Sequence, residues 1–155
     1  MIRVAAYKGK SWVSKAIKWQ TWGNYSHIGI ILPDGKIVEA WQGTNNVRII
    51  NHLGDGHAKG TEVDIYHVPM TDEQEHKFTQ EALSCVGKKY DYWGIVGFLA
   101  RKHYANDDKF FCSELFAHCC KVAGTPYFRF VEPYKVSPQR AVLGIFHKVD
   151  TVVTL

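Results

Sequence analysis

The sequence predicts an α+β fold in a single domain, residues 1–155, and three observations support this prediction. Short stretches of alternating or continuous apolar residues are separated by turn signals, which is typical of strands in an antiparallel sheet. Other stretches repeat their apolar residues with the helical period and carry capping residues or a terminal glycine. A chain of 155 residues, 46% of them hydrophobic, is long enough to bury its own core. We expect an antiparallel sheet of about five or six strands, with the helix that begins near Cys112 packed on one face.

The first elements are a strand and a short helix. The apolar segment Ile2–Tyr7 is predicted as a strand, and a turn rich in lysine and glycine follows it. Ser11 is a suitable N-cap for a helix over residues 12–19. In this helix the two lysines point outward, and the inward residues are Trp12, Val13, Ala16 and Ile17.

A β-hairpin is predicted from Ser26 to Trp41. Its turn, LPDGK, has proline and glycine where a three-residue hairpin loop requires them. In the register that this turn sets, His27 lies opposite Trp41 and Glu39 lies opposite Gly29, so His27 and Glu39 are diagonal neighbours on one face. A carboxylate beside an imidazole selects its tautomer and supports its positive charge. The alternative is an exposed sheet face with an incidental ion pair, and a slip of one residue would separate the two side chains.

The remaining elements are read from periodicity and turn signals. They are strands over Val47–Ile50, Glu62–Val68, Phe128–Val131 and Gly144–Val153, a helix from the capping box at Thr71 to about Val86, and an apolar helix over Tyr92–Ala100.

The segment Phe110–Gly124, FFCSELFAHCCKVAG, is predicted as a helix with one apolar face. Asp107 and Asp108 are candidate N-caps, which places Cys112 in the first turn. Backbone N–H groups and the helix dipole at that position favour a thiolate, so Cys112 is a candidate nucleophile. The alternative is a core cysteine, since cysteine is among the most buried residue types.

The cysteines do not form a recognisable metal or disulfide pattern. Four are present, and no two of them have the CxxC spacing. Cys119 and Cys120 are adjacent, so on a helix they point in directions roughly 100° apart and chelate one ion poorly, even with His118 alongside. We expect no structural zinc and no cofactor.

Three segments in this order carry a family resemblance: SHIGI with a following strand that ends in EAW, then GKKYDYWG, then FFCSELFAHCCKVAG. Together they resemble the NlpC-type papain-like cysteine peptidases and amidases, in the circularly permuted branch in which the histidine strand precedes the cysteine helix. Proteins related to lecithin:retinol acyltransferase share that order. The resemblance spans about residues 26–124 and implies a papain-like fold.

The resemblance also implies site residues. Cys112 matches the nucleophile, His27 the base, and Glu39 the polar residue that orients the histidine, although unpermuted members more often have His, Asn or Gln at this third position. Tyr90 matches a tyrosine beside the nucleophile. We expect Tyr90, Ser26 and Trp41 to contact the substrate.

The implied reaction is acyl transfer through an acyl-enzyme. We expect a cysteine amidase or endopeptidase that acts on a peptide or amide substrate, with cell-wall peptides as the substrates that the family suggests. One alternative keeps the same three residues and acts on a lipid ester or acyl group. Another is a binding module without catalysis.

Charge and hydropathy suggest the partners and the compartment. The net charge is +4, and the first 25 residues contain five basic residues and no carboxylate, so this end would face an anionic polymer or a membrane surface unless it is simply solvated. We expect no nucleic-acid partner. The sequence shows no signal peptide or transmembrane run, so we expect the chain to be cytoplasmic as synthesised, with export by another route if its substrate is extracellular.

Overall fold

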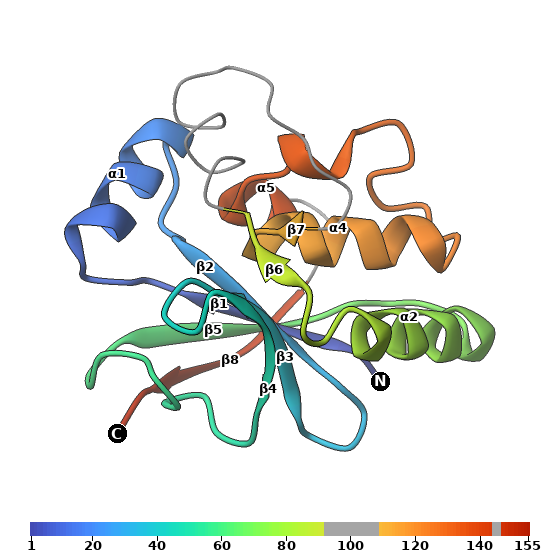
Figure 1. The fold of residues 1–155 in the computed structure, drawn as a ribbon, viewed down its shortest axis with the longest axis horizontal. Coiled ribbons are helices and arrows are strands. Elements are labelled where there is room, and N and C mark those ends of the chain that lie inside the picture. Colours follow the sequence, from blue (N-terminus) through green and yellow to red (C-terminus); the bar gives the residue numbers. More distant parts are fainter. Residues whose placement is uncertain (92–108, 144–146) are drawn as a thin grey trace.

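The computed structural model describes residues 1–91, 109–143 and 147–155 (Figure 1). The strands are β1 (Arg3–Tyr7), β2 (His27–Ile31), β3 (Ile37–Trp41), β4 (Asn46–Ile50), β5 (Glu62–His67), β6 (Lys89–Tyr90), β7 (Lys109–Phe110) and β8 (His147–Val153). The α-helices are α1 (Trp12–Thr21), α2 (Asp72–Ser84), α4 (Cys112–Val122) and α5 (Pro138–Val142), and a 3-10 turn covers Pro133–Lys135. The predicted helix over Tyr92–Ala100 lies outside the described residues.

The described strands form one sheet in the order β7-β6-β4-β3-β2-β1-β5-β8. Neighbouring strands are antiparallel except β6 and β7, which pair in parallel, so the sheet is mixed and has eight strands. The prediction of an antiparallel sheet of five or six strands is therefore wrong. The reason is local: β6 and β7 have two residues each, too few for an alternating pattern to be visible in the sequence.

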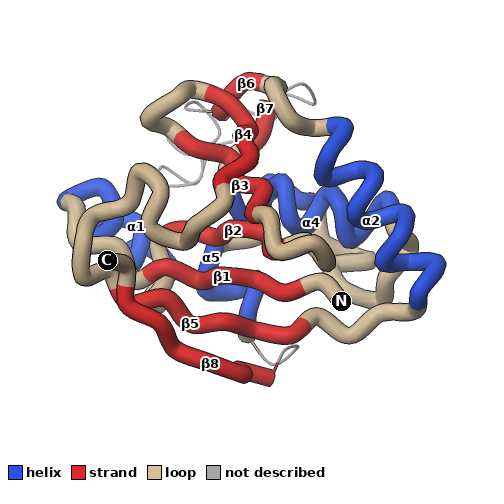
Figure 2. The backbone as a smooth tube through the Cα atoms, turned by 90° about the horizontal axis from the view of Figure 1, so that it is seen from below, coloured by secondary structure: helices blue, strands red, loops and turns tan. Residues whose placement is uncertain are grey.

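The helices lie mainly on one side of the sheet (Figures 1 and 2). Helix α4 packs against β2 and β3, and α2 and α5 pack against α4. The main core forms between these layers and includes Ile28, Ile30 and Val38 from the strands and Leu115 and Phe116 from α4. A smaller apolar cluster around Ala5, Ile37 and Ile65 covers part of the opposite face.

The hairpin has the predicted register. Leu32 N donates to Lys36 O over 2.8 Å, and Gly35 adopts a φ of +89°, which a residue with a side chain rarely does. Ile30 pairs with Val38, as the turn predicts. Both predicted hairpin strands are confirmed, and the register that brings His27 and Glu39 to one face is correct.

The capping predictions hold for α1 and α2. The Ser11 hydroxyl accepts a hydrogen bond from Ser14 N at the start of α1. Thr71 and Gln74 form a reciprocal capping box at the start of α2, each side chain bonded to the other's backbone N–H. Each such cap contributes about 1 kcal/mol to helix stability.

Two local predictions are wrong. The N-cap of α4 is Phe111, whose N–H donates to the Glu114 carboxylate over 3.3 Å, whereas Asp107 and Asp108 lie outside the described residues. The segment Phe128–Val131 is a turn and not a strand, because Phe128 has a φ of +57° and packs its ring against Phe116. None of the helices in the described ranges is long and apolar enough to cross a bilayer.

Candidate active site

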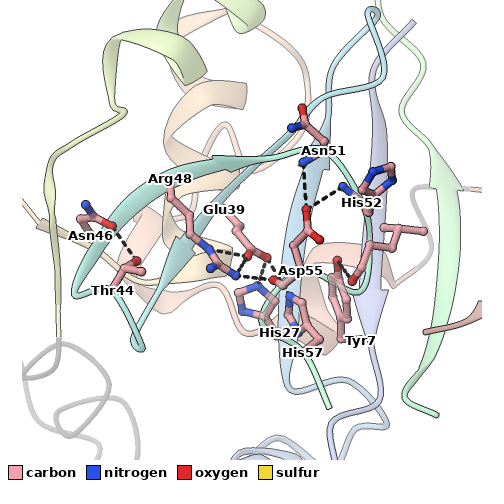
Figure 3. Close-up of polar contacts among 11 residues, drawn as sticks. Tyr7, His27, Glu39, Thr44, Asn46, Arg48, Asn51, His52, Asp55 and His57 are labelled. Atoms are coloured by element: carbon pink, nitrogen blue, oxygen red, sulfur yellow. Dashed lines mark hydrogen bonds and ion pairs between the residues drawn. The ribbon is translucent and has the colours of Figure 1, made fainter. Parts of the chain in front are cut away.

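The centre of the candidate site is the predicted pair of His27 and Glu39. His27 begins β2, Glu39 lies in the middle of β3, and His27 Nε2 is 2.8 Å from Glu39 Oε2 (Figure 3). Gly29 lies between them on the same face, where an added Cβ would be 2.9 Å from the Ile37 side chain and 3.8 Å from Glu39 Oε2. A side chain at Gly29 would therefore crowd Ile37, whereas Glu39 Oε2 would be at an ordinary contact distance.

Glu39 is completely buried and has three basic partners. Arg48, directly opposite on β4, donates from Nε and Nη2 to Oε1 over 3.0 and 2.6 Å. His57 Nε2 is 3.1 Å from Oε2, the oxygen that also bonds His27 (Figure 3). Burial would raise the pKa of Glu39, but the bonds and charges of His27 and His57 hold it well below its usual range. Glu39 is therefore a permanent buried anion.

The loop between β4 and β5 delivers His57 to this cluster. Arg48 Nη2 donates to Asp55 O over 2.7 Å, and the Asp55 carboxylate accepts from the backbone of Asn51 and His52. Gly56 has a φ of +83°, and a Cβ there would lie 2.8 Å from Arg48 Nη2. The same arginine that binds Glu39 thus also holds the loop that carries His57.

The two histidines differ in charge. Burial lowers the pKa of His57, and the positive charge of His27 lowers it further against the opposing effect of Glu39. Burial alone would also lower the pKa of His27, but Cys112 and Glu39 reverse this and raise it from 6.5 to about 10. At neutral pH His27 is the imidazolium and His57 is the neutral imidazole.

Cys112 is the first residue of α4 and is buried. Cys112 is the strongest influence that raises the pKa of the His27 imidazole, so the two side chains lie next to each other. Because Nε2 of His27 is bonded to Glu39, Nδ1 is the nitrogen left for Cys112. The first-turn N–H groups of α4 lie next to the thiol and lack helical acceptors. The structure thus brings the three predicted residues Cys112, His27 and Glu39 together.

The described residues enclose a pocket of about 230 Å³ beside His27. Trp41, Tyr90 and Ser26, the three predicted substrate contacts, all line it, together with His57 and residues of α1. Trp41 packs edge-on to His27, with ring centroids 5.3 Å apart. The Ser26 hydroxyl accepts from Gly9 N over 3.1 Å, so it also anchors the loop that leads to α1.

Sequence reasoning missed three members of the site: Arg48, His57 and Tyr7. The Tyr7 ring stacks on His57 with centroids 4.0 Å apart, and its hydroxyl donates to Leu53 O. Arg48 falls in a strand that was predicted, but no local signal shows that this strand pairs with β3. His57 comes from a loop, where no periodic pattern exists to place it.

The donor atoms of His27, Glu39 and His57 all lie within 4.8 Å of one another. Two imidazoles and one carboxylate are suitable ligands for zinc and similar ions, and Glu39 Oε2 remains on the side away from Arg48. The residues therefore fit a divalent ion in type and spacing, although the expectation from the sequence was that no metal binds.

Comparison with known proteins identifies a shared fold. No family model matches the chain, and no curated protein matches it. A solved structure, described as metalloprotein yiiX from Escherichia coli O157:H7, DUF1105, matches with a TM-score of 0.58 at 22% sequence identity, over 98% of this chain and 87% of that one. At this identity the likeness shows the fold alone. Together with the mixed eight-stranded sheet, it overturns the predicted papain-like fold class.

Proposed function

We propose that this protein is a cysteine-dependent hydrolase of the amidase or endopeptidase type, with Cys112 as nucleophile and His27 as its acid and base. The observation that supports this most is the chain of contacts from Glu39 through His27 to Cys112. A thiol at a helix start, next to an imidazolium that a buried carboxylate stabilises, is the arrangement of an activated nucleophile. Kinship with the NlpC-type enzymes stays a prediction.

In this proposal the reaction proceeds in two steps. The Cys112 thiolate attacks the carbonyl carbon, and the resulting oxyanion accepts hydrogen bonds from first-turn N–H groups of α4. His27 donates its Nδ1 proton to the leaving amine, which departs as the C–N bond breaks. The neutral His27 then takes a proton from water, whose hydroxyl attacks the acyl carbon. The C–S bond breaks, the acid leaves, and the Cys112 thiolate and the His27 imidazolium are restored. Glu39 keeps the Nε2 proton of His27 in place throughout.

The pocket suggests how much of the substrate is enclosed. Its volume of about 230 Å³ is below the roughly 300–1,000 Å³ of sites that enclose a drug-sized molecule. The described walls therefore suit one residue of a peptide, with Trp41 and Tyr90 as its aromatic contacts. A lipid ester cleaved by the same residues is the second substrate class, and parallel assays on peptide and ester panels with the Cys112→Ala control separate the two.

Thiol alkylation tests the proposal without a known substrate. The rate of iodoacetamide labelling is measured at each cysteine by mass spectrometry, from pH 5 to 9. We expect Cys112 to react fastest below pH 7, because burial raises the pKa of Cys85, of Cys119 and, to about 12, of Cys120. The His27→Ala variant should lose this advantage.

The matched control for this experiment is His118→Ala. His118 is also bonded to a glutamate, with His118 Nε2 2.8 Å from Glu81 Oε1, so its removal breaks a similar pair away from Cys112. Labelling of Cys112 should not change in this variant. If Cys112 in the unmodified chain reacts no faster than the other cysteines, the hydrolase proposal is wrong and a binding module becomes the better explanation.

A second candidate function is a metal site at His27, Glu39 and His57. Two observations favour it: the spacing of the three donors, and the description of the solved structure with the same fold as a metalloprotein. A divalent ion there would act as a Lewis acid toward a bound carbonyl. His27 would have to release its proton, so metal binding and the imidazolium required for the cysteine reaction exclude each other. Zinc that slows Cys112 labelling in the unmodified chain, but not in His57→Ala, would support this candidate.

Helix α1 is the proposed contact for an anionic polymer or membrane surface. Trp19 and Trp22 are 77% and 92% exposed, Lys15 is exposed, and Ser14 and Ile17 of the same helix line the pocket. Docking through α1 would bring the pocket close to that surface. Co-sedimentation with anionic vesicles and with an anionic wall polymer tests this, and Trp19→Ser with Trp22→Ser should reduce binding to the true partner. The cytoplasmic location stays a prediction.

A further inference from the structure

A second group of metal-binding side chains lies between α2 and α4. Glu81 lies in the last turn of α2, Cys85 caps its C-terminal end, and His118 projects from α4, which packs against α2. Their positions are 81, 85 and 118, so the group is assembled by helix packing and has no short sequence motif. It shares no residue with the cluster around Glu39.

The three donor atoms converge. His118 Nε2 is 2.8 Å from Glu81 Oε1, and Cys85 Sγ is 3.6 Å from the same oxygen. All three lie within 4.8 Å of one another. Around a tetrahedral zinc ion, bonds of about 2.0–2.3 Å place neighbouring donors about 3.3–3.6 Å apart. The sulfur is already at this separation from the oxygen, and the imidazole and carboxylate need to part by only about 0.5 Å.

We propose that Glu81, Cys85 and His118 bind a divalent transition-metal ion of the zinc type. The donor set of one thiolate, one imidazole and one carboxylate suits zinc and cobalt and does not suit magnesium or calcium. Binding replaces the proton of Cys85 with the metal and releases it to solvent. The carboxylate and the thiolate together balance the charge of the ion.

The surroundings allow an ion to reach these donors. The side chains of His118 and Glu81 are 30% and 23% exposed, whereas Cys85 is buried, so the group opens to solvent on one side. Three protein ligands leave a fourth position for water. The centroid of the Phe110 ring lies 5.0 Å from that of the His118 ring. Lys88 Nζ lies over the Phe110 ring, 5.3 Å from its centroid. Lys88 is thus a positive charge near the site, and it opposes the binding of a cation.

The simpler explanation is an ion pair between His118 and Glu81 that joins two helices, and a cobalt titration separates the two explanations. The full chain is stripped with chelator and titrated with Co²⁺, while the thiolate-to-cobalt charge-transfer absorption and the released protons are followed. We expect one equivalent to bind with this absorption in the unmodified chain. Cys85→Ser should abolish the absorption, and Glu81→Gln and His118→Ala should weaken binding by at least about 100-fold.

Two controls separate this site from the candidate active site. Cys112→Ala removes the cysteine beside His27, and His57→Ala removes a donor from the cluster around Glu39; both should keep the absorption. Circular dichroism of each metal-free variant shows whether it is folded. Glu81→Gln tests the same site at a partly exposed position, so the result does not depend only on a change at the buried Cys85. Absorption that persists in Cys85→Ser, disappears in Cys112→Ala, or never develops in the unmodified chain would overturn the proposal.

Discussion

The Glu39 carboxylate divides its two oxygens between different tasks: Oε1 binds Arg48, and Oε2 binds His27 at 2.8 Å. Oε1 therefore holds Arg48 of β4 in place, and Oε2 stabilises the protonated form of His27, which lies beside Cys112.

Removal of the charge of Glu39 should affect both stability and reactivity. Glu39→Gln leaves Arg48 without its buried anion, which we expect to cost about 3 kcal/mol in the free energy of unfolding. The pKa of His27 should fall, and hydrolysis of any substrate found should slow by at least about 100-fold. Urea denaturation and Cys112 labelling against pH measure the two effects. Glu81→Gln, which changes the other glutamate paired with a histidine, should leave Cys112 labelling unchanged.

Arg48→Lys should lower the stability of the fold but leave Cys112 reactive. Lysine cannot donate from two nitrogens in one plane, so the bonds to Glu39 and to Asp55 O cannot both be kept in their present form. We expect a loss of about 1–3 kcal/mol in the free energy of unfolding. Labelling of Cys112 should stay within about threefold of the unmodified rate, because Oε2 still binds His27. A loss of labelling as large as in His27→Ala would show that Arg48 also sets the charge of His27. The exposed Arg129→Lys is the control.

His57 should make the protein sensitive to mild acid. Its pKa is lower in the folded chain than the ordinary 6.5, so below that pH the unfolded chain binds more protons and the folded state loses stability. His57→Gln should therefore lose less stability than the unmodified protein between pH 7 and pH 5. Denaturant unfolding at both values measures this. His52→Gln, in the same loop and exposed, should behave like the unmodified chain, and an equal loss in His57→Gln would contradict the assignment.

Gly56 and Gly35 form a matched pair for testing the loop that carries His57. Both have a positive φ, +83° and +89°, so alanine costs about 1 kcal/mol of backbone strain at either position. Only at Gly56 would the new Cβ approach Arg48, whereas at Gly35 nothing lies within 4 Å. We expect Gly56→Ala to lower the temperature of thermal unfolding clearly more than Gly35→Ala does. It should also change the pH dependence of stability that His57 causes. Equal effects would mean that Arg48 moves aside freely.

Local patterns in the sequence were sufficient for the parts of the site that one hairpin and one helix contain. The turn around Gly35 sets the register, and the register alone predicts that His27 lies beside Glu39. The apolar repeat and the residues after it predict the helix that starts at Cys112, although not its N-cap. Backbone geometry determines these features over short distances along the chain, so they can be read without knowledge of the fold.

The tertiary structure alone decided which elements become neighbours. Arg48 reaches Glu39 because β4 pairs with β3, and His57 reaches it because the Asp55 loop folds back onto Arg48. The two-residue strands β6 and β7, which make the sheet mixed, exist only through their pairing with each other and with β4. Glu81, Cys85 and His118 meet only because α2 packs on α4. Such contacts depend on the burial of whole faces, and no short stretch of sequence encodes that.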